Sequence, residues 1–320
     1  MRERLKGRKA RSGIALSLVL SLVLSACSAE GQEGKGAESD GKIAIVTTIA
    51  QIAEPLSIIG GDKVSVSSLM GPGVDPHLYN ATQGDIKKMA SADIVFYSGP
   101  HLEGNMTEVF EQIGKTKPVK AIAEAIPEDL RLKDEKGDTD PHVWFDIDLW
   151  GTALGSATDG LKEHFPEHAE LFEANKNDYL KKLDELKTES AHMMSTIPET
   201  QRVLVTAHDA FGYFGRMHDL KVVGLQGLST EDEIGITDVD DTIGLLLEYK
   251  VPAVFVESSV NQNSINAVIQ GAGSRGLKVK LGGELFSDAM GDGGTPEGTY
   301  IGMYRHNVKT IATALGGGGN

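Results

Sequence analysis

Hydrophobic runs rich in β-branched residues alternate with longer amphipathic stretches along most of the chain. Three strands and two helices are expected in the first half, the strands at 43–49, 64–70 and 93–98 and the helices near 51–60 and 82–90. Four further strands are expected in the second half, at 202–207, 221–226, 253–258 and 279–285. Alternation of this kind is typical of βαβ units on a mostly parallel sheet. The pattern therefore predicts an α/β fold with two lobes, each a mostly parallel sheet flanked by helices.

A single long helix is expected between these two sets of strands. Pro166 stands near the start of the segment and Pro198 near its end, and no glycine or proline lies between them. Proline near the first turn and beyond the last turn is common helix punctuation. Hydrophobic residues recur at spacings of three, four and seven, and they are Leu171, Phe172, Tyr179, Leu180, Leu183 and Leu186. A helix of about thirty residues spans about 45 Å, so we expect a stiff connector that restrains movement between the lobes.

The N-terminus has the pattern of a secretory signal. Six basic residues precede an apolar run at 14–24, which is followed by Ser25, Ala26 and Cys27. A run of about a dozen residues is too short for a hydrocarbon core, which needs about 20. The sequence Leu24-Ser25-Ala26-Cys27 resembles a bacterial lipobox, in which the cysteine is acylated and anchors the mature protein to the membrane. Cys27 is the only cysteine, which excludes disulfides and cysteine-based metal sites.

These patterns divide the chain into five expected segments. Residues 28–41 are small or polar and cannot bury enough apolar surface to order themselves. The segments are a signal peptide at 1–26, the lipidated cysteine with a flexible tether at 27–41, an N-terminal α/β lobe at 42–163, the linking helix at 164–198 and a C-terminal α/β lobe at 199–316. The length that remains after the tether suits two ordinary domains.

The charge balance narrows the range of partners. The full chain has a formal net charge of −15, and removal of residues 1–26, with six basic residues and one acidic, leaves 25 basic and 45 acidic residues. A charge of −20 argues against nucleic acid as a partner. The charge is compatible with cations, although it defines no site. No feature of the sequence indicates an oligomer, and we expect a monomer.

The candidate chemistry consists of histidines and an aspartate that follow predicted strands. The tripeptide Asp-Pro-His occurs twice and ends at His77 and at His142, while His208 and Asp288 follow strands of the second half. Parallel α/β sheets bind ligands outside the carboxyl ends of their strands, and proline stiffens the loop that presents each histidine. Separations of 65, 66 and 80 residues exclude a local finger motif. Each residue alone could equally cap a loop, but together they suit a cleft to which each lobe contributes two ligands.

Seven segments of the chain closely resemble one protein family. They are MGPGVDPHLYNATQGD at 70–85, HLEGNM at 101–106, DPHVWFDIDLW at 140–150, VTAHDAFGYFG at 205–215, GLQGLSTEDE at 224–233, VFVESSVNQNSI at 254–265 and GGELFSDAMG at 282–291. They resemble the zinc- and manganese-binding solute-binding lipoproteins of bacterial ABC importers, and the resemblance extends over about residues 43–315, closest to the manganese-binding branch.

The resemblance implies a fold, a function and a set of ligands. Two pseudo-symmetric lobes joined by a long helix would hold a divalent metal between His77, His142, His208 and Asp288. The protein would be lipid-anchored through Cys27 on the extracytoplasmic face of the bacterial cell membrane. It would deliver its cargo to the importer's permease and ATPase and would not be an enzyme.

The identity of the metal stays open between manganese and zinc. Many manganese-selective relatives carry a glutamate where His208 stands, and zinc-selective relatives often carry a histidine-rich insertion, whereas residues 114–140 contain no histidine. Three imidazoles and one carboxylate suit Zn²⁺ at about 2.0 to 2.2 Å, and an aspartate that binds through both oxygens suits five-coordinate Mn²⁺. We favour manganese, with zinc as the alternative. Because imidazoles bind metals when neutral, affinity should fall as the pH drops through about 6.5.

Three further residues and two further functions fit parts of the sequence. His101 follows the strand at 93–98 and is a weaker ligand candidate. Asp209 either orients a ligand or caps a helix that begins at Ala210. Glu257 is interpreted as structural.

A metallohydrolase would need a general base and an open coordination position, and the sequence carries neither HExxH nor GxSxG. A surface adhesin, with a role in cell adhesion, fits the anchor and the charge but not four converging ligands.

Overall fold

Parallel strand pairs form every sheet in residues 41–316, the part of the chain that this computed structural model describes. The expected α/β fold is confirmed. The expected signal peptide, the acylated Cys27 and all but the last residue of the tether lie outside the described residues. Among the described helices, none combines the length and the hydrophobicity needed to cross a bilayer.

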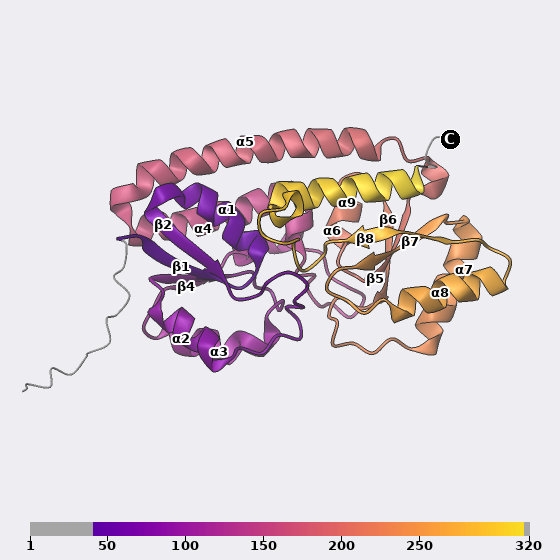
Figure 1. The fold of residues 1–320 in the computed structure, drawn as a ribbon, viewed down its shortest axis with the longest axis horizontal. Coiled ribbons are helices and arrows are strands. Elements are labelled where there is room, and N and C mark those ends of the chain that lie inside the picture. The colour runs from indigo at the N-terminus through magenta and orange to yellow at the C-terminus, as the bar shows by residue number, and fades with distance from the viewer. Residues whose placement is uncertain (1–40, 317–320) are drawn as a thin grey trace, which may run out of the picture. The chain divides into compact units, whose positions relative to one another are not determined.

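The first half of the described chain builds a four-stranded sheet with the order β2-β1-β3-β4. Its strands are β1 (Ile43–Thr47), β2 (Val64–Ser68), β3 (Ile94–Tyr97) and β4 (Val119–Ala121). The helices are α1 (Ala50–Gly60), α2 (Gln83–Ser91), α3 (Thr107–Gly114) and α4 (Ile147–His164). Helices α1 and α4 cover one face and α2 and α3 the other (Figure 1). With both faces covered, the central strands read as continuous apolar runs, IAIVT and IVFY.

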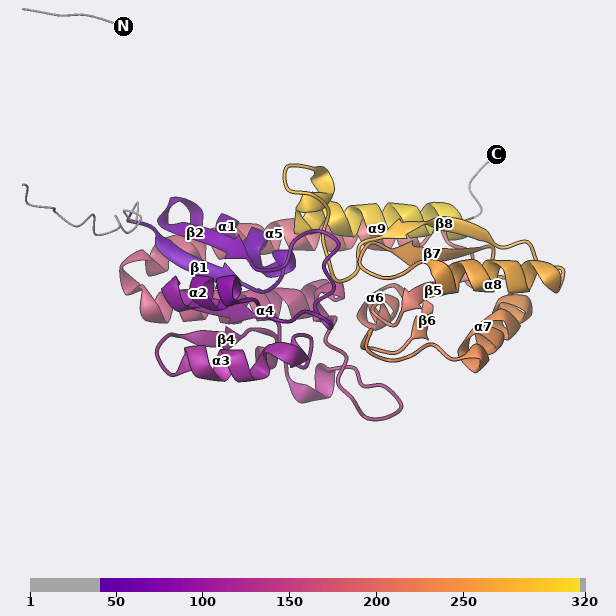
Figure 2. The same ribbon diagram turned by 60° about the horizontal axis from the view of Figure 1, so that its bottom comes forward.

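The second half contributes four strands in two parallel pairs. Strand β5 (Val203–His208) pairs with β6 (Lys221–Gln226), β7 (Ala253–Glu257) pairs with β8 (Lys280–Leu285), and β5 lies against β7. The helices are α6 (Gly212–His218), α7 (Ile236–Tyr249), α8 (Asn263–Ser274) and α9 (Tyr300–Leu315). The strands lie between α9 on one side and α7 and α8 on the other (Figure 1, Figure 2). Every residue of β5 is buried, so its carboxyl end delivers a side chain into the interior.

The long helix between the two halves is α5 (Ala169–Met194), which packs against α1, α4 and α9. The sequence predicted a long helix here, but α5 begins at Ala169 and not at the expected residue 164. Pro166 disfavours the helical conformation at Phe165, which has φ −134° and ψ 64°. Helix α4 therefore ends at His164, and a 3₁₀ turn at Pro166–His168 leads into α5.

Three regular elements of the first half had no prediction, and they are β4, α3 and α4. Strand β4 has three residues, all half-buried, and such a short edge strand has no alternating pattern to detect. Helix α4 is capped by Asp146, whose side chain accepts hydrogen bonds from the amides of Asp148 and Leu149. It contains Gly151, Gly155 and Gly160, which weaken the helical signal of its sequence.

Candidate metal centre

Four side chains from distant parts of the chain converge at one buried point. His77, His142, His208 and Asp288 each offer one nitrogen or oxygen, and these atoms all lie within 4.8 Å of one another. His77 is 4 % exposed, and the other three are 1 % exposed or less. His208 is the last residue of β5, and Asp288 lies three residues beyond β8. All four residues that the sequence singled out for a metal are therefore brought together.

The distances among the four match the spacing of donors around one ion. The Nε2 atoms of His77 and His142 are 3.3 Å apart. Asp288 places Oδ1 3.3 Å from Nε2 of His142, and Oδ2 3.3 Å from Nε2 of His208 and 4.0 Å from Nε2 of His77. A tetrahedral ion with bonds of about 2.0 to 2.2 Å separates its donors by about 3.3 to 3.6 Å. The side chains therefore need only small shifts to surround an ion.

Carboxylates behind two of the imidazoles hold the rings in place. Nδ1 of His142 lies 2.7 Å from Oδ1 of Asp140, and Nδ1 of His208 lies 2.5 Å from Oε2 of Glu257. The same carboxyl groups accept the backbone N–H of each histidine at 2.9 Å. A partner at Nδ1 fixes the tautomer and directs Nε2 toward the ion. The interpretation of Glu257 as merely structural therefore missed its contact with His208.

The two Asp-Pro-His motifs share a local geometry. Oδ1 of Asp75 accepts the N–H of His77 at 2.9 Å, just as Asp140 accepts that of His142. A carboxylate that bonds the amide two residues ahead forms a tight local turn. The first motif is held from behind as well, because Nδ2 of Asn105 donates to the carbonyl of His77 at 3.0 Å. The repeat of the tripeptide was the sequence signal for this ordering role of the aspartates.

Two side chains from the first half hold the loop that carries Asp288. Gln51 donates from Nε2 to the carbonyl of Asp288 at 2.9 Å and to that of Ser287 at 3.3 Å. The indole N–H of Trp144 donates to the carbonyl of Ser287 at 3.2 Å. Trp144 also packs edge-on against the ring of His142, with ring centroids 5.3 Å apart. The backbone around Asp288 is thus fixed, and its carboxylate is left facing the imidazoles.

Three atoms that could bind a metal here have no hydrogen-bond partner in the described structure. They are Nε2 of His208 and both carboxylate oxygens of Asp288. An unpaired buried polar atom costs about 1 to 3 kcal/mol, and more when it is charged. A fold therefore tolerates such atoms where a cation satisfies them, so the donor set fits a divalent metal.

The environment sets the protonation of the four groups before a metal binds. Burial lowers the pKa of His77 to about 3, so this ring is neutral and ready to bind. Burial also disfavours the charged form of His142, but the adjacent Asp140 and Asp288 outweigh it and raise its pKa to about 9. Glu257 and Asp288 likewise outweigh burial and raise the pKa of His208 well above 6.5. The three imidazoles overcome burial at Asp288 and hold its pKa well below 3.8. Protons on His142 and His208 must therefore leave before an ion binds.

The other candidate residues lie outside the cluster. His101 has a φ of 65°, is exposed, and lines a cavity beside His77 rather than the cluster. Asp209 does not cap a helix, because α6 begins at Gly212 with Phe211 as its N-cap, and that expectation was wrong. Burial raises the pKa of Asp209 to about 6.

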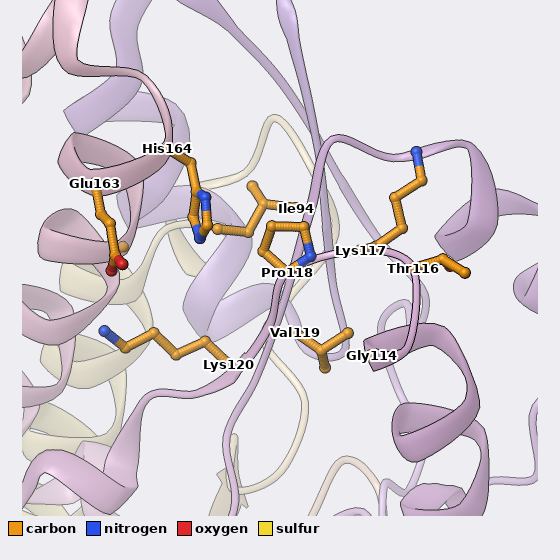
Figure 3. A pocket seen from close by; sticks show the side chains of 10 residues that line it. Ile94, Gly114, Thr116, Lys117, Pro118, Val119, Lys120, Glu163 and His164 are labelled. Atoms are coloured by element: carbon orange, nitrogen blue, oxygen red, sulfur yellow. The ribbon is translucent and has the colours of Figure 1, made fainter.

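A separate hollow on the first sheet carries none of the four residues. Figure 3 shows it at the amino ends of β3 and β4, lined among others by Ile94, Lys117, Val119 and His164. The amino ends lie at the edge opposite to the one where parallel sheets bind their ligands. The carboxyl ends of the strands are therefore the functional edge.

Comparison with known proteins places this geometry in a family. Residues 45–314 match the family described as zinc-uptake complex component A, periplasmic. The manganese-binding lipoprotein MntA of Bacillus subtilis is 49 % identical over 307 residues, which cover 95 % of this chain and 99 % of that protein. The structure of the periplasmic zinc-binding protein TroA from Treponema pallidum superimposes with a TM-score of 0.84 at 44 % identity, over 86 % of this chain and 99 % of that one.

A third similar structure is Fe(III)-bound YtgA from Chlamydia trachomatis, with a TM-score of 0.77 and 29 % identity over 86 % of this chain and 98 % of that one. The names of these three relatives thus refer to three different metals. The match over nearly the whole described chain, at up to 49 % identity, confirms the resemblance seen in the sequence. The chain belongs to the zinc-uptake complex component A family of metal-binding proteins.

Proposed function

We propose that this chain captures a divalent transition metal outside the cytoplasm and delivers it to an ABC importer, with His77, His142, His208 and Asp288 as the ligands of the cargo ion. The observation that carries the proposal is the convergence of four buried donor atoms within 4.8 Å, several of them without any hydrogen-bond partner in the described structure. Residues on either side of α5 contribute two ligands each. The segments at 42–163 and 199–316 then act as lobes, with 164–198 as their connection.

Manganese is the preferred cargo in this proposal, and zinc is the alternative. The Bacillus subtilis relative is named for manganese and the Treponema pallidum relative for zinc. Asp288 has both oxygens free of hydrogen bonds and facing imidazoles, so it can bind through both and supply the fifth donor that manganese accepts. By the Irving–Williams order, zinc binds the isolated site more tightly whatever the cargo in the cell. Affinity in solution therefore does not identify the cargo.

The cellular setting follows from the sequence and the relatives. The Bacillus subtilis relative is named a lipoprotein, and Cys27 stands where an acylated cysteine would be expected. We propose that acylation of Cys27 anchors the protein to the outer face of the cell membrane, where a permease with its ATPase receives the metal. Neither the relatives' names nor the metal centre favours a role in cell adhesion.

The chain is a binding protein and not an enzyme, as its family indicates. Four protein donors close the coordination of a zinc ion, whereas a catalytic zinc keeps a position for water. The buried cluster also has little contact with solvent, since His77 is its most exposed member at 4 %. A metallohydrolase is therefore the weaker interpretation of the same residues.

Uptake by living cells tests the proposal. A strain that lacks this protein should fail to grow and to accumulate metal under limitation by its cargo, and the intact gene should restore both. Rescue by manganese alone identifies manganese, and rescue by zinc alone reverses the cargo while keeping the carrier. Rescue by a gene carrying Asp288→Ala, at equal protein level and at the lowest metal concentration that supports the intact strain, would contradict the proposed site.

A further inference from the structure

A cavity reaches the metal centre at one ligand only. It has a volume of about 330 Å³, and His77 is the one member of the four that lines it. His77 is also the most exposed of the four, at 4 %. Residues of the segment 134–141 line one side of the cavity, and residues of the segment 227–233, which follows β6, line another. We call this segment the cover loop. An ion that moves between solvent and the site along this cavity passes His77 beneath the cover loop.

Two side-chain hydrogen bonds attach the cover loop to the loop of His77. The hydroxyl of Thr230 donates to Oδ2 of Asp75 at 2.6 Å, while Oδ1 of Asp75 accepts the N–H of His77. Nδ2 of Asn105 donates to Oε1 of Glu231 and to the carbonyl of His77, both at 3.0 Å. Both backbone polar groups of His77 are therefore held by side chains that also hold the cover loop.

The rest of the cover loop is held only weakly. Its residues are half-buried or exposed, and none belongs to the hydrophobic core. Its shape is maintained from its base, because Nε2 of Gln226, the last residue of β6, donates to the carbonyls of Thr230 and Asp232. The ion pair between Lys136 and Asp232, at 3.5 Å, is exposed, and exposed pairs contribute little. The loop can thus move as a unit once the bonds of Thr230 and Asn105 open.

We propose that Thr230 and Asn105 form a latch that closes the cover loop over the bound ion. This inference rests on the proposed function and assigns the two residues a positioning role, since neither is a ligand. An ion at Nε2 fixes the ring of His77, and the backbone of the same residue anchors the latch. Binding of the ion and closure of the loop therefore stabilise each other, and by linkage an open latch shortens the residence of the ion.

The dissociation rate of the ion tests the latch. The protein is loaded with Zn²⁺ alone and mixed rapidly with excess chelator, and release is followed with a metal indicator. Thr230→Val removes the hydroxyl at nearly constant volume and should raise the dissociation rate about tenfold, the effect of one hydrogen bond to a charged group. Asn105→Ala should raise it by a similar factor, and Thr230→Ser, which keeps the hydroxyl, should restore the original rate.

Two controls separate the latch from a general loss of structure. Thr188→Val makes the same substitution on the exposed side of α5, where the hydroxyl donates to the carbonyl of Asp184, and it should leave the rate unchanged. The absorption spectrum of the Co²⁺-loaded variants should match that of the original protein, because the ligands are untouched. An equal rise in Thr188→Val, or an altered cobalt spectrum in the latch variants, would overturn the proposal.

The latch and the proposed function fail in different ways. If the original protein binds Zn²⁺ while Thr230→Val and Asn105→Ala both release it at the original rate, the latch is wrong and the metal centre stands. If the original protein binds no divalent metal, the proposed function itself is wrong, and the latch falls with it.

Discussion

The protonation of the empty site predicts how strongly metal affinity depends on pH. With its pKa near 9, His142 carries a proton at pH 7, and His208 does so as well because its pKa is raised far above 6.5. His77, with a pKa of about 3, is neutral, and Asp288 is ionised. Binding of an ion through all four residues therefore releases about two protons at pH 7.

The magnitude follows from proton linkage. Two released protons make the association constant rise about 100-fold for each pH unit, which corresponds to about 2.7 kcal/mol. The association constant should continue to rise above pH 7 and level off only beyond pH 9, where His142 is already deprotonated in the metal-free protein. Ordinary histidines would instead give a rise that ends just above pH 6.5, as the sequence alone led us to expect. The structure corrects that expectation because it places two carboxylates at each of these rings.

Calorimetry measures the released protons directly. Titration of the metal-free protein with Mn²⁺ at pH 7, in buffers with different ionisation enthalpies, gives the number of protons from the slope of the apparent enthalpy. We expect about two. A slope near zero at pH 7, together with an affinity that is flat between pH 7 and 9, would refute the assignment of protons to His142 and His208.

Three further predictions follow from the same contacts. Glu257→Gln removes the charge behind His208 and should weaken Mn²⁺ binding about 10- to 100-fold in a titration, whereas the exposed Glu248→Gln should leave it unchanged. Saturation at 100 times the dissociation constant should stabilise the fold by about 2.7 kcal/mol, and no rise in the midpoint of thermal unfolding would exclude a preformed site. The metal-free protein should lose about 3 kcal/mol of stability from His142 as the pH rises from 6.5 through 9, because Asp140 and Asp288 stabilise the charged ring in the folded state only; a flat pH profile in chemical denaturation would contradict these two ion pairs.

The strands were predictable because of their composition. The expected run at 221–226 coincides with β6, and the other long strands agree within two residues at each end. Strand β4 and helix α4 were missed for different reasons. Strand β4 is too short to show a period in its sequence, and three glycines interrupt the helical pattern of α4. The start of α5 also departed from expectation, because the sequence alone did not reveal how strongly Pro166 would act on Phe165.

The candidate ligands were predictable, but what tunes them was not. The repeated Asp-Pro-His tripeptide and the ends of two strands pointed to the four residues that converge. Glu257 lies 49 residues from His208 in the chain, and the packing of β7 against β5 brings them together. The hydrogen bonds of Thr230 and Asn105 to the loop of His77 likewise join residues far apart in sequence. Such contacts depend on tertiary structure and leave no local pattern.

The most direct test of the account is the amount of manganese bound per chain after equilibrium dialysis at pH 8, measured for the original protein and for three single variants. We predict one bound ion for the original protein and for His192→Ala, whose side chain is exposed on α5. Asp288→Ala and His142→Ala should retain almost none while unfolding cooperatively without metal. One tightly bound ion in both of these variants would contradict the claim that the four converging residues hold the cargo.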